Sequence, residues 1–151
     1  MPTLNSLWPV TNADGTLDAS FSGDGKATTD LTSGHDFANA ITAEADGSLV
    51  LGGSAWPRGR AKAGSRFAMV RYTPEGTLDA SFGGDGKVLT KLTRRNDSAQ
   101  DVAVQTDGKI VAAGVAGVRE LLQTIPGMRE WRLRVTTRTG HSTKASAGTA
   151  R

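Results

Sequence analysis

A stretch of 13 residues occurs twice in this chain, 61 positions apart. Residues 14–26 read DGTLDASFSGDGK and residues 75–87 read EGTLDASFGGDGK, so 11 of the 13 positions are identical. A second match at the same offset aligns residues 36–53 with residues 97–114. A period of this length predicts structural units that cover one another, and such units usually serve as scaffolds.

Composition places the chain among β-rich proteins. It has 151 residues, enough for one domain with its own core, and its 19 glycines with only 5% aromatic residues favour short strands and tight turns. The absence of cysteine excludes disulfides and thiolate metal sites. No apolar run approaches about 18 residues, so we expect no membrane span. Met1–Val10 lacks the basic stretch and apolar core of a secretory signal.

Apolar and β-branched segments predict antiparallel strands within each repeat. They are residues 40–44, 48–52 and 67–73 in the first copy, and residues 87–92, 101–105 and 110–114 further on, with a polar turn at 93–98. Asp46-Gly47 and Asp107-Gly108 separate neighbouring strands. Since Asp-Gly supplies positive φ values, we expect type I′ hairpin turns at both places.

Four short strands per repeat, joined as a meander, predict an all-β fold of antiparallel four-stranded sheets that resemble β-propeller blades. Both faces of residues 110–113 are apolar, as expected for a sheet between two neighbours. A β-sandwich and a β-solenoid are the alternatives. Because the chain holds only about one and a half to two repeats, we expect an incomplete fold that associates with itself through exposed strand edges.

The repeats also divide the chain. Residues 1–13 form a lead-in, interpreted as a remnant of a preceding repeat; residues 14–74 form repeat 1, residues 75–114 a partial repeat 2, and residues 115–151 a divergent tail. Up to residue 114 there are 11 basic and 13 acidic residues, whereas the tail has 7 basic and 2 acidic ones. The tail is thus basic.

The tail does not continue the repeat. The segment Phe67–Tyr72 has no copy near residues 128–133. We expect a helix to begin at residues 118–123 and disorder after Thr139, where hydrophobicity is low. Two explanations stay open: an atypical capping element, or a shift of the reading frame near residue 115.

The repeated strings resemble the bacterial delta-60 repeat. They are GTLDASFGGDGKV from residue 76, AQDVAVQTDGKIVAAG from residue 99, and FAMVRY from residue 67. The resemblance covers about residues 10–114. It implies a β-propeller relative without assigned chemistry, found in long tandem arrays that often belong to large exported or surface proteins. It brings no catalytic residues, cofactor or metal ligands to this chain.

Carboxylates recur between the glycines of the two copies. They are Asp14, Asp18 and Asp24 in the first copy and Glu75, Asp79 and Asp85 in the second. Three acidic residues within such a short loop leave a calcium site open, although their spacing differs from that of an EF-hand. Aspartates that stabilise turns through bonds to their own backbone are the interpretation we favour, with Leu and Phe of each Leu-Asp-Ala-Ser-Phe corner in the core.

Other reactive residues stand apart from one another. His35 has no counterpart in the second repeat and is expected in a solvated loop, and His141 lies in the tail without partners for a metal. Residues 83–87 contain Gly-Gly-Asp-Gly-Lys but not the Walker pattern, and Lys87 leads into a strand. The sequence therefore gives no catalytic, cofactor-binding or metal-binding residue, and we expect no enzyme.

A basic insertion separates two strands of the first repeat. Residues 54–66 carry Trp56, Pro57, Arg58, Arg60, Lys62 and Arg66. With the arginines between 129 and 151, they form the basis of an alternative function, binding of nucleic acid or another polyanion. The favoured hypothesis is a non-catalytic repeat module of a larger bacterial surface or exported protein, and a propeller-based enzyme is the third alternative. The ligand and the compartment are left open.

Overall fold

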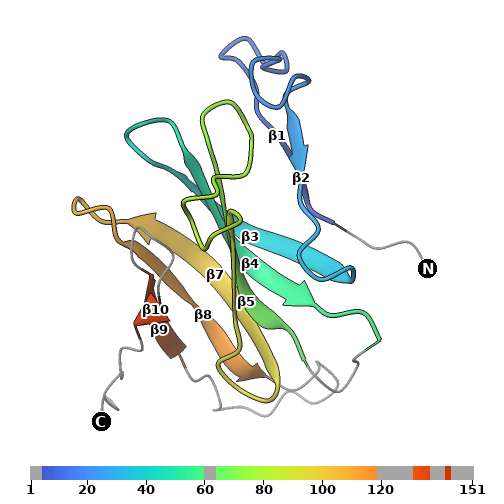
Figure 1. The fold of residues 1–151 in the computed structure, drawn as a ribbon, viewed down its shortest axis with the longest axis vertical. Coiled ribbons are helices and arrows are strands. Elements are labelled where there is room, and N and C mark those ends of the chain that lie inside the picture. Colours follow the sequence, from blue (N-terminus) through green and yellow to red (C-terminus); the bar gives the residue numbers. More distant parts are fainter. Residues whose placement is uncertain (1–4, 60–63, 119–130, 137–141, 144–151) are drawn as a thin grey trace.

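The computed structural model describes residues 5–59, 64–118, 131–136 and 142–143 (Figure 1). Throughout these residues the regular elements are strands. Their bounds are β1 (Leu7–Pro9), β2 (Lys26–Thr28), β3 (His35–Ala43), β4 (Leu49–Trp56), β5 (Arg66–Tyr72), β6 (Lys87–Thr90), β7 (Asn96–Val104), β8 (Ile110–Val118), β9 (Trp131–Thr136) and β10 (Ser142–Thr143).

The strands form three antiparallel sheets, ordered β1-β2, β3-β4-β5-β6 and β7-β8-β9-β10. This confirms the all-β prediction with open, four-stranded, blade-like sheets. The central sheet takes β6 from beyond Glu75, so the sheets are out of phase with a repeat counted from residue 14.

Strand pairing repeats at the same offset as the sequence. Leu7 pairs with Thr28 in the small sheet, and Ala68 pairs with Leu89 in the central sheet, 61 residues later. The β3–β4 ladder has a register shift between Ala38 and Ala40, and β7–β8 has one between Ala99 and Asp101. In structural terms, β1-β2 corresponds to the last two strands of the central sheet, and β7-β8 corresponds to its first two.

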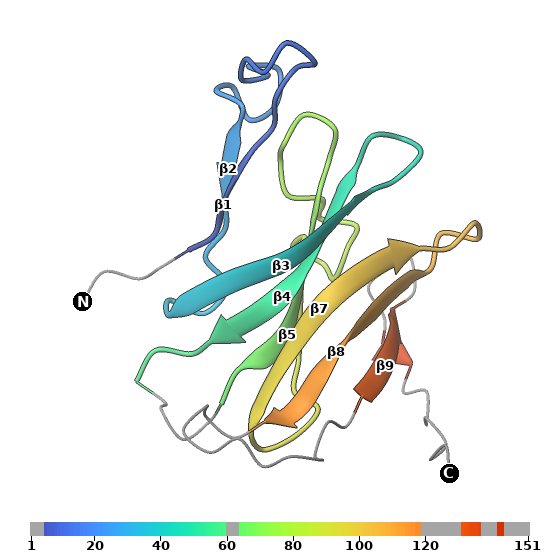
Figure 2. The same ribbon diagram turned by 180° about the vertical axis from the view of Figure 1, so that it is seen from behind.

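The central sheet lies between the other two (Figures 1 and 2). The core on its β7 side, the β7-facing core, consists of Val50, Phe67, Met69, Phe82, Ala99, Val102, Ile110 and Ala112. The core on its other side, the β1-facing core, consists of Phe21, Ala27, Leu51, Val70 and Tyr72, with half-buried Trp8 packed against it. Apolar residues on both faces of one strand are thus explained by sheets on both sides.

The hairpin turns occur where the sequence predicts them, but their type differs. In the β3–β4 turn, the N–H of Gly47 donates to the carbonyl of Glu44 and the N–H of Glu44 to that of Ser48. Gly47 and Gly108 have φ of 88° and 79°, whereas positive φ among the described non-glycine residues occurs only at Ser22 and Ser33. A type I′ turn needs two positive φ values, so that prediction is wrong. The turns are three-residue loops that end in a left-handed glycine.

Four strands are longer than expected, β3, β4, β7 and β8. Asn96, placed by the sequence in a polar turn, begins β7 and pairs with Val118 at the end of β8. β8 accordingly runs on to Val118, because the earlier start of β7 needs a longer partner. Further along, β9 pairs with β8 although its residues do not copy Phe67–Tyr72, since backbone hydrogen bonds do not depend on side-chain identity. The helix expected at 118–123 falls, after Val118, outside the described residues, as does most of the chain after Thr139.

Candidate functional site

The repeated acidic side chains stabilise their own turns, as the sequence predicts. Oδ1 of Asp14 accepts from the N–H of Thr16 at 2.9 Å, and Oδ1 of Asp18 accepts from Ser20 at 2.9 Å. The same contact recurs from Asp24 to Lys26, Asp46 to Ser48, Asp79 to Ser81, Asp85 to Lys87 and Asp107 to Lys109. Hydroxyl donors add to it: Thr16 and then its backbone N–H lower the pKa of Asp14.

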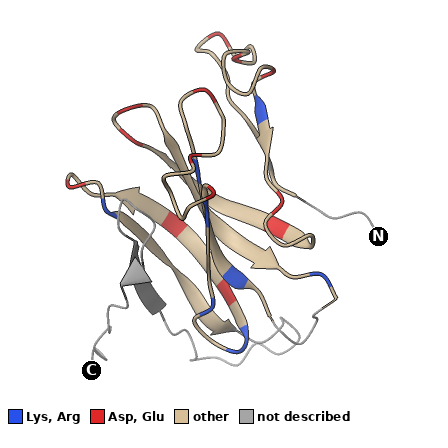
Figure 3. Ribbon diagram, in the orientation of Figure 1, with Lys and Arg blue, Asp and Glu red and all other residues tan. Residues whose placement is uncertain are grey.

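These carboxylates do not converge. Among the described residues, no group of three His, Cys, Asp or Glu side chains is placed to hold a metal ion. Each aspartate instead accepts from the backbone of its own turn, and the acidic residues are spread over several loops (Figure 3). The arrangement that the sequence left open for calcium is therefore not formed by the described residues.

Arg71 is the centre of a buried polar cluster in the second corner. Its Nε donates to Oδ2 of Asp79 at 2.6 Å, and its Nη2 donates to Oγ of Ser81 at 3.1 Å. Its Nη1 lies 3.6 Å from Oε2 of Glu44, and its Cζ lies 5.8 Å from the ring centroid of Phe82. This one side chain joins β5, the β3–β4 turn and the corner after β5.

Electrostatics around Arg71 favour the charged form of Asp79. Burial by itself would raise the pKa of Asp79, but hydrogen bonds from Ser81 and Arg71 and the positive charge of Arg71 outweigh it, so the pKa is lowered. Perturbed carboxylates often mark active sites. Here each acceptor is occupied by a structural donor, so the cluster fastens a corner.

The Leu-Asp-Ala-Ser-Phe corners are only partly as predicted. Phe21 and Phe82 are both buried, and the aspartates cap the corners as expected. Leu78 is half-buried, but its counterpart Leu17 is 41% exposed, so its predicted place in the core is wrong. Leu78 packs against the β1-facing core, whereas no described sheet lies beyond β1-β2 to cover Leu17.

A buried aspartate holds the start of β3 and the start of β7. Asp97 is fully buried, and Oδ2 accepts from the N–H groups of Leu92 and Thr93 at 2.9 and 3.0 Å. Its Oδ1 accepts from Oγ1 of Thr93 at 2.7 Å and from the N–H of Gly117 at 3.2 Å. Asp36, its counterpart in β3, is bound in the same manner by Leu31 and Thr32.

These aspartates also mark the joints between sheets. Oγ of Ser65, at the start of β5, donates to the carbonyl of Asp97 at 2.8 Å and accepts from its N–H at 3.1 Å. Oγ of Ser6 donates in the same way to the carbonyl of Asp36, at 3.2 Å. Sequence reasoning missed this function because Asp97 stands in a polar segment that reads as a turn. The alignment of Asp36 with Asp97 was the available signal.

The remaining single residues of interest have structural or exposed positions. His35 is not in a loop but is the first residue of β3, opposite Trp56, and its side chain is exposed. Lys87 begins β6, and its Nζ donates to the carbonyl of Asp30 at 3.1 Å. No helix follows it in the described segments, as a phosphate loop would require. His141 lies outside the described residues.

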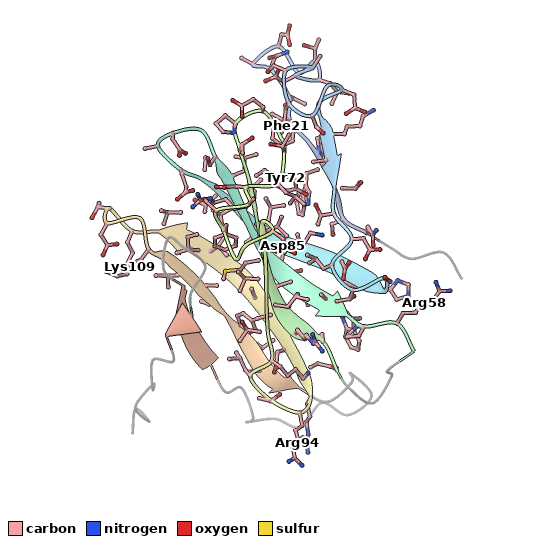
Figure 4. The ribbon with its side chains drawn as sticks, viewed as in Figure 1. Phe21, Arg58, Tyr72, Asp85, Arg94 and Lys109 are labelled. Atoms are coloured by element: carbon pink, nitrogen blue, oxygen red, sulfur yellow. The ribbon has the colours of Figure 1, made fainter. Side chains whose placement is uncertain are left out.

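Basic residues gather at the end of the sheets opposite the Asp-Gly turns. Arg94 projects from that end and Arg58 from its side, while Lys109 lies at a turn (Figure 4). Gly64 lies against the backbone of Arg95, which brings the insertion beside the β6–β7 loop.

Within this basic region, Lys91 is already engaged. Its Nζ donates to the carbonyl of Ser65 at 2.6 Å and to that of Arg95. Burial lowers the pKa of Lys91 and nearby Arg66 adds to this, while Asp97 opposes it. Trp56 is half-buried at the end of β4, and Arg60 and Lys62 lie outside the described residues. The predicted basic loop thus contributes Arg58 and Arg66 to the described surface.

A cavity of about 30 Å³ lies between the small sheet and the central one. Its lining includes Trp8, Leu51, Gly53, Val70 and Tyr72. This volume fits about one water molecule and is far below that of a metabolite site. Burial raises the pKa of Tyr72, whose hydroxyl meets that of Thr29 beside the cavity.

Comparison with known proteins supports the architecture. Residues 44–82 match the model of a domain of unknown function described as a β-propeller (DUF5122). The match runs from the β3–β4 turn through β5 to Phe82, so it includes the whole Arg71 cluster. It supports a propeller-like repeat family for this part of the chain. No curated protein matches the chain, and no described helix is long and apolar enough to cross a membrane.

Proposed function

We propose that the chain is a non-catalytic repeat module of the delta-60 type, belonging to a larger bacterial surface or exported protein and presenting loops for binding. The observation that carries the proposal is the use of the polar side chains: the turn aspartates, Asp36, Asp97 and the Arg71 cluster are all bound to structural partners. The match to a propeller-like domain without known chemistry supports a scaffold.

Catalysis is tested on the purified chain with chromogenic esters, phosphate esters and glycosides. We expect no turnover above the uncatalysed rate, because the carboxylates already accept hydrogen bonds that stabilise turns and corners. Asp79→Asn serves as the comparison, since Asp79 is the carboxylate that bonds Arg71 in the buried cluster. Turnover that Asp79→Asn abolishes while the protein stays folded would show that the chain is an enzyme.

The location of the parent protein needs a separate test. Intact cells of the source organism are treated with a protease that does not enter them, and antibodies raised against the chain follow its loss. Loss from intact cells is expected for a surface protein. Retention until the cells are lysed would contradict this part of the proposal.

Binding of a polyanion is the second candidate, favoured by the exposed Arg58 and Arg94 away from the acidic turns. Lysine and arginine neutralise phosphates or sulfates, and such binding weakens with salt. Heparin affinity is measured for Arg58→Glu, Arg94→Glu and the double variant. Lys109→Glu is the matched control, since it makes the same charge change at a turn on the opposite side of the molecule.

If the basic region binds polyanions, Arg58→Glu and Arg94→Glu should each elute at lower salt than Lys109→Glu, which changes the net charge by the same amount, and the dependence of affinity on salt should become shallower in the double variant. Equal elution of the three single variants would indicate attraction by net charge alone and would reject this candidate.

A further inference from the structure

The exposed face of β3 is the counterpart of a buried one. Ile41 is 48% exposed, whereas Val102, its equivalent in β7, is 6% exposed. Val102 is buried because it packs on β4: its Cγ1 would lie 2.4 Å from a Cβ placed on Gly52. Ile41 is exposed because no described strand packs on this face of β3 as β4 packs on Val102 of β7.

The outer face of the last sheet shows the complementary difference. Val50 is fully buried in the β7-facing core, while its equivalent Val111 in β8 is only half-buried. Polar contacts differ in the same way, because Asn39 makes a hydrogen bond between sheets and its equivalent Gln100 does not make the corresponding one within the described chain. Nδ2 of Asn39 donates across the joint to the carbonyl of Ala99 at 2.6 Å, whereas Gln100 bonds within its own strand.

We propose that a second copy of this chain packs its β3 face on the β7–β8 face of the first, reproducing between chains the joint that links β3–β6 to β7–β8 within one chain. The proposal rests on the repeat-module assignment above. Ile41 of one copy then lies against Val111 of the other, as Val102 lies in the core with Val50. Gln100 reaches the second copy's β3 as Asn39 reaches β7.

Strand pairing supports the same arrangement. β7-β8 corresponds to the first two strands of a blade, and β1-β2 corresponds to the last two, so the two ends of the chain hold complementary half-blades. In the assembly, β1 of the second copy takes the edge of β8 that β9 holds in the single chain, because β1 has the equivalent position to β5. The register places Trp8 opposite Ala113, as Met69 pairs with Gly52.

The interface is head-to-tail, since each copy uses a different surface on its two sides. Such contacts form rings or open chains. Two single substitutions can therefore block opposite sides. Ile41→Glu places a charge on the β3 face, and Val111→Glu places one on the β8 face, where burial of an unpaired charge is costly. Ala45→Glu and Thr106→Glu are matched controls, because both residues are exposed at the equivalent position of the two hairpin turns.

The test is sedimentation of the full-length chain over a range of concentrations. The wild type and both controls should form species larger than dimers, and each blocking variant alone should have a dissociation constant at least about tenfold higher, equivalent to 1.4 kcal/mol. Mixed in equal amounts, the two blocking variants should form a dimer, because one intact face remains on each. A monomeric wild type, or a mixture that behaves as its separate components do, would overturn the proposal.

Hydrogen exchange separates this joint from other self-association, because exchange of the amides in 131–136 should become faster on assembly as β1 replaces β9. Unchanged protection of β9 in an associated sample would exclude the half-blade arrangement while leaving the scaffold proposal intact. Ala113→Gly provides a second check, since the Cβ of Ala113 stands where Gly52 leaves room for Val102, so Ile41 of the second copy must shift to pass it. This variant should associate more tightly, and weaker association would contradict the residue pairing.

Discussion

The guanidinium of Arg71 meets acceptors from two segments distant in sequence, the β3–β4 turn and the corner after β5, and it lies over the ring of Phe82 in that corner. Buried charges are tolerated when they are paired and fully hydrogen-bonded. Val10 occupies the equivalent position of the first repeat, so the described corner beside the small sheet has no such cluster and is fastened by Phe21, the Asp18 cap and backbone hydrogen bonds. The two corners of nearly identical sequence therefore differ in their electrostatics.

The first prediction at this scale concerns acid stability. The pKa of Asp79 is lower in the folded chain than in the unfolded one, so the unfolded chain binds more protons as the pH falls. The contribution of Asp79 to folding is present above about pH 4, the value of a free aspartate, and is lost as the pH falls through the lower folded value. Urea unfolding between pH 7 and pH 2 should show stability declining below about pH 4.

The variant Asp79→Asn isolates the part due to this group. It should be less stable at pH 7, and its stability should depend less on pH in the acid range. The slope will not vanish, since Asp14, Asp18, Asp46 and Asp107 also have lowered pKa values. A variant with the same acid profile as the wild type would mean that Asp79 does not titrate with folding.

The second prediction concerns Gly47. Its φ of 88° is unfavourable for residues with a side chain, while the nearest atoms to an added Cβ are those of Pro74 at 3.5 Å, an ordinary contact. Gly47→Val should therefore cost about 1–2 kcal/mol through backbone strain. Thermal unfolding measures it, with Ala45→Val in the same turn as the control. Equal melting temperatures for the two variants would show that the turn relaxes into another type.

At the scale of single elements, β7 depends on the carboxylate of Asp97. The third prediction is that Asp97→Asn destabilises the chain by about 2 kcal/mol or more, because hydrogen bonds to a charged group are lost and an amide N–H₂ faces buried donors. Asp101→Asn is the control, since Asp101 lies on the same strand but is exposed. Chemical unfolding of both variants at pH 7 is the measurement, and similar losses would assign the effect to charge alone.

Elements were predictable where local chemistry determines them. Asp46-Gly47 and Asp107-Gly108 located both hairpins, because few residues tolerate positive φ. The type of turn was missed, since the loop is one residue longer than the Asp-Gly pair suggests. The length of β7 was missed because Asn96 and Asp97 are polar. Burial of Asp97 becomes favourable only in the fold, where Leu92, Thr93 and the distant Gly117 donate to its carboxylate. The buried cluster around Arg71 was not predicted, because Glu44 is distant from Arg71 in sequence and only the fold brings the two side chains together.

For the whole molecule, the neighbours of each sheet determine what is exposed. The same Leu-Asp corner buries its leucine or leaves it in solvent according to whether another sheet stands beside it. No propensity scale contains this information. The domain boundaries at residues 13, 74 and 114 were predicted from the sequence repeat and stay predictions. The boundaries of a sheet need not coincide with those of a sequence repeat.

The fourth prediction concerns the edge of β8. A chain that ends at Val118 lacks β9, which pairs with β8 from Ile110 to Val115. The open edge should promote association at concentrations where the full chain is less associated. Light scattering of both chains at equal concentration is the measurement. Identical behaviour would show that β9 does not protect this edge.

The fifth prediction concerns the coding DNA of the tail. If a frame shift separates the tail from the repeat, one of the other two frames after the codon for Gly114 should encode Phe-Ala-x-x-Arg-Tyr followed by a Gly-x-Leu-Asp-x-x-Phe corner. Sequencing that region decides the question. Absence of both strings would favour a capping element, whose removal should then lower the melting temperature.

The half-blades at the two ends have a consequence for how such genes can change length. A unit of 61 residues contains one strand of each kind, but it gives its strands to two neighbouring sheets. Duplication or deletion of one whole unit by unequal recombination therefore adds or removes one sheet and leaves every strand with its former type of partner. The number of 61-residue units can therefore change between lineages without a new kind of contact between sheets having to evolve.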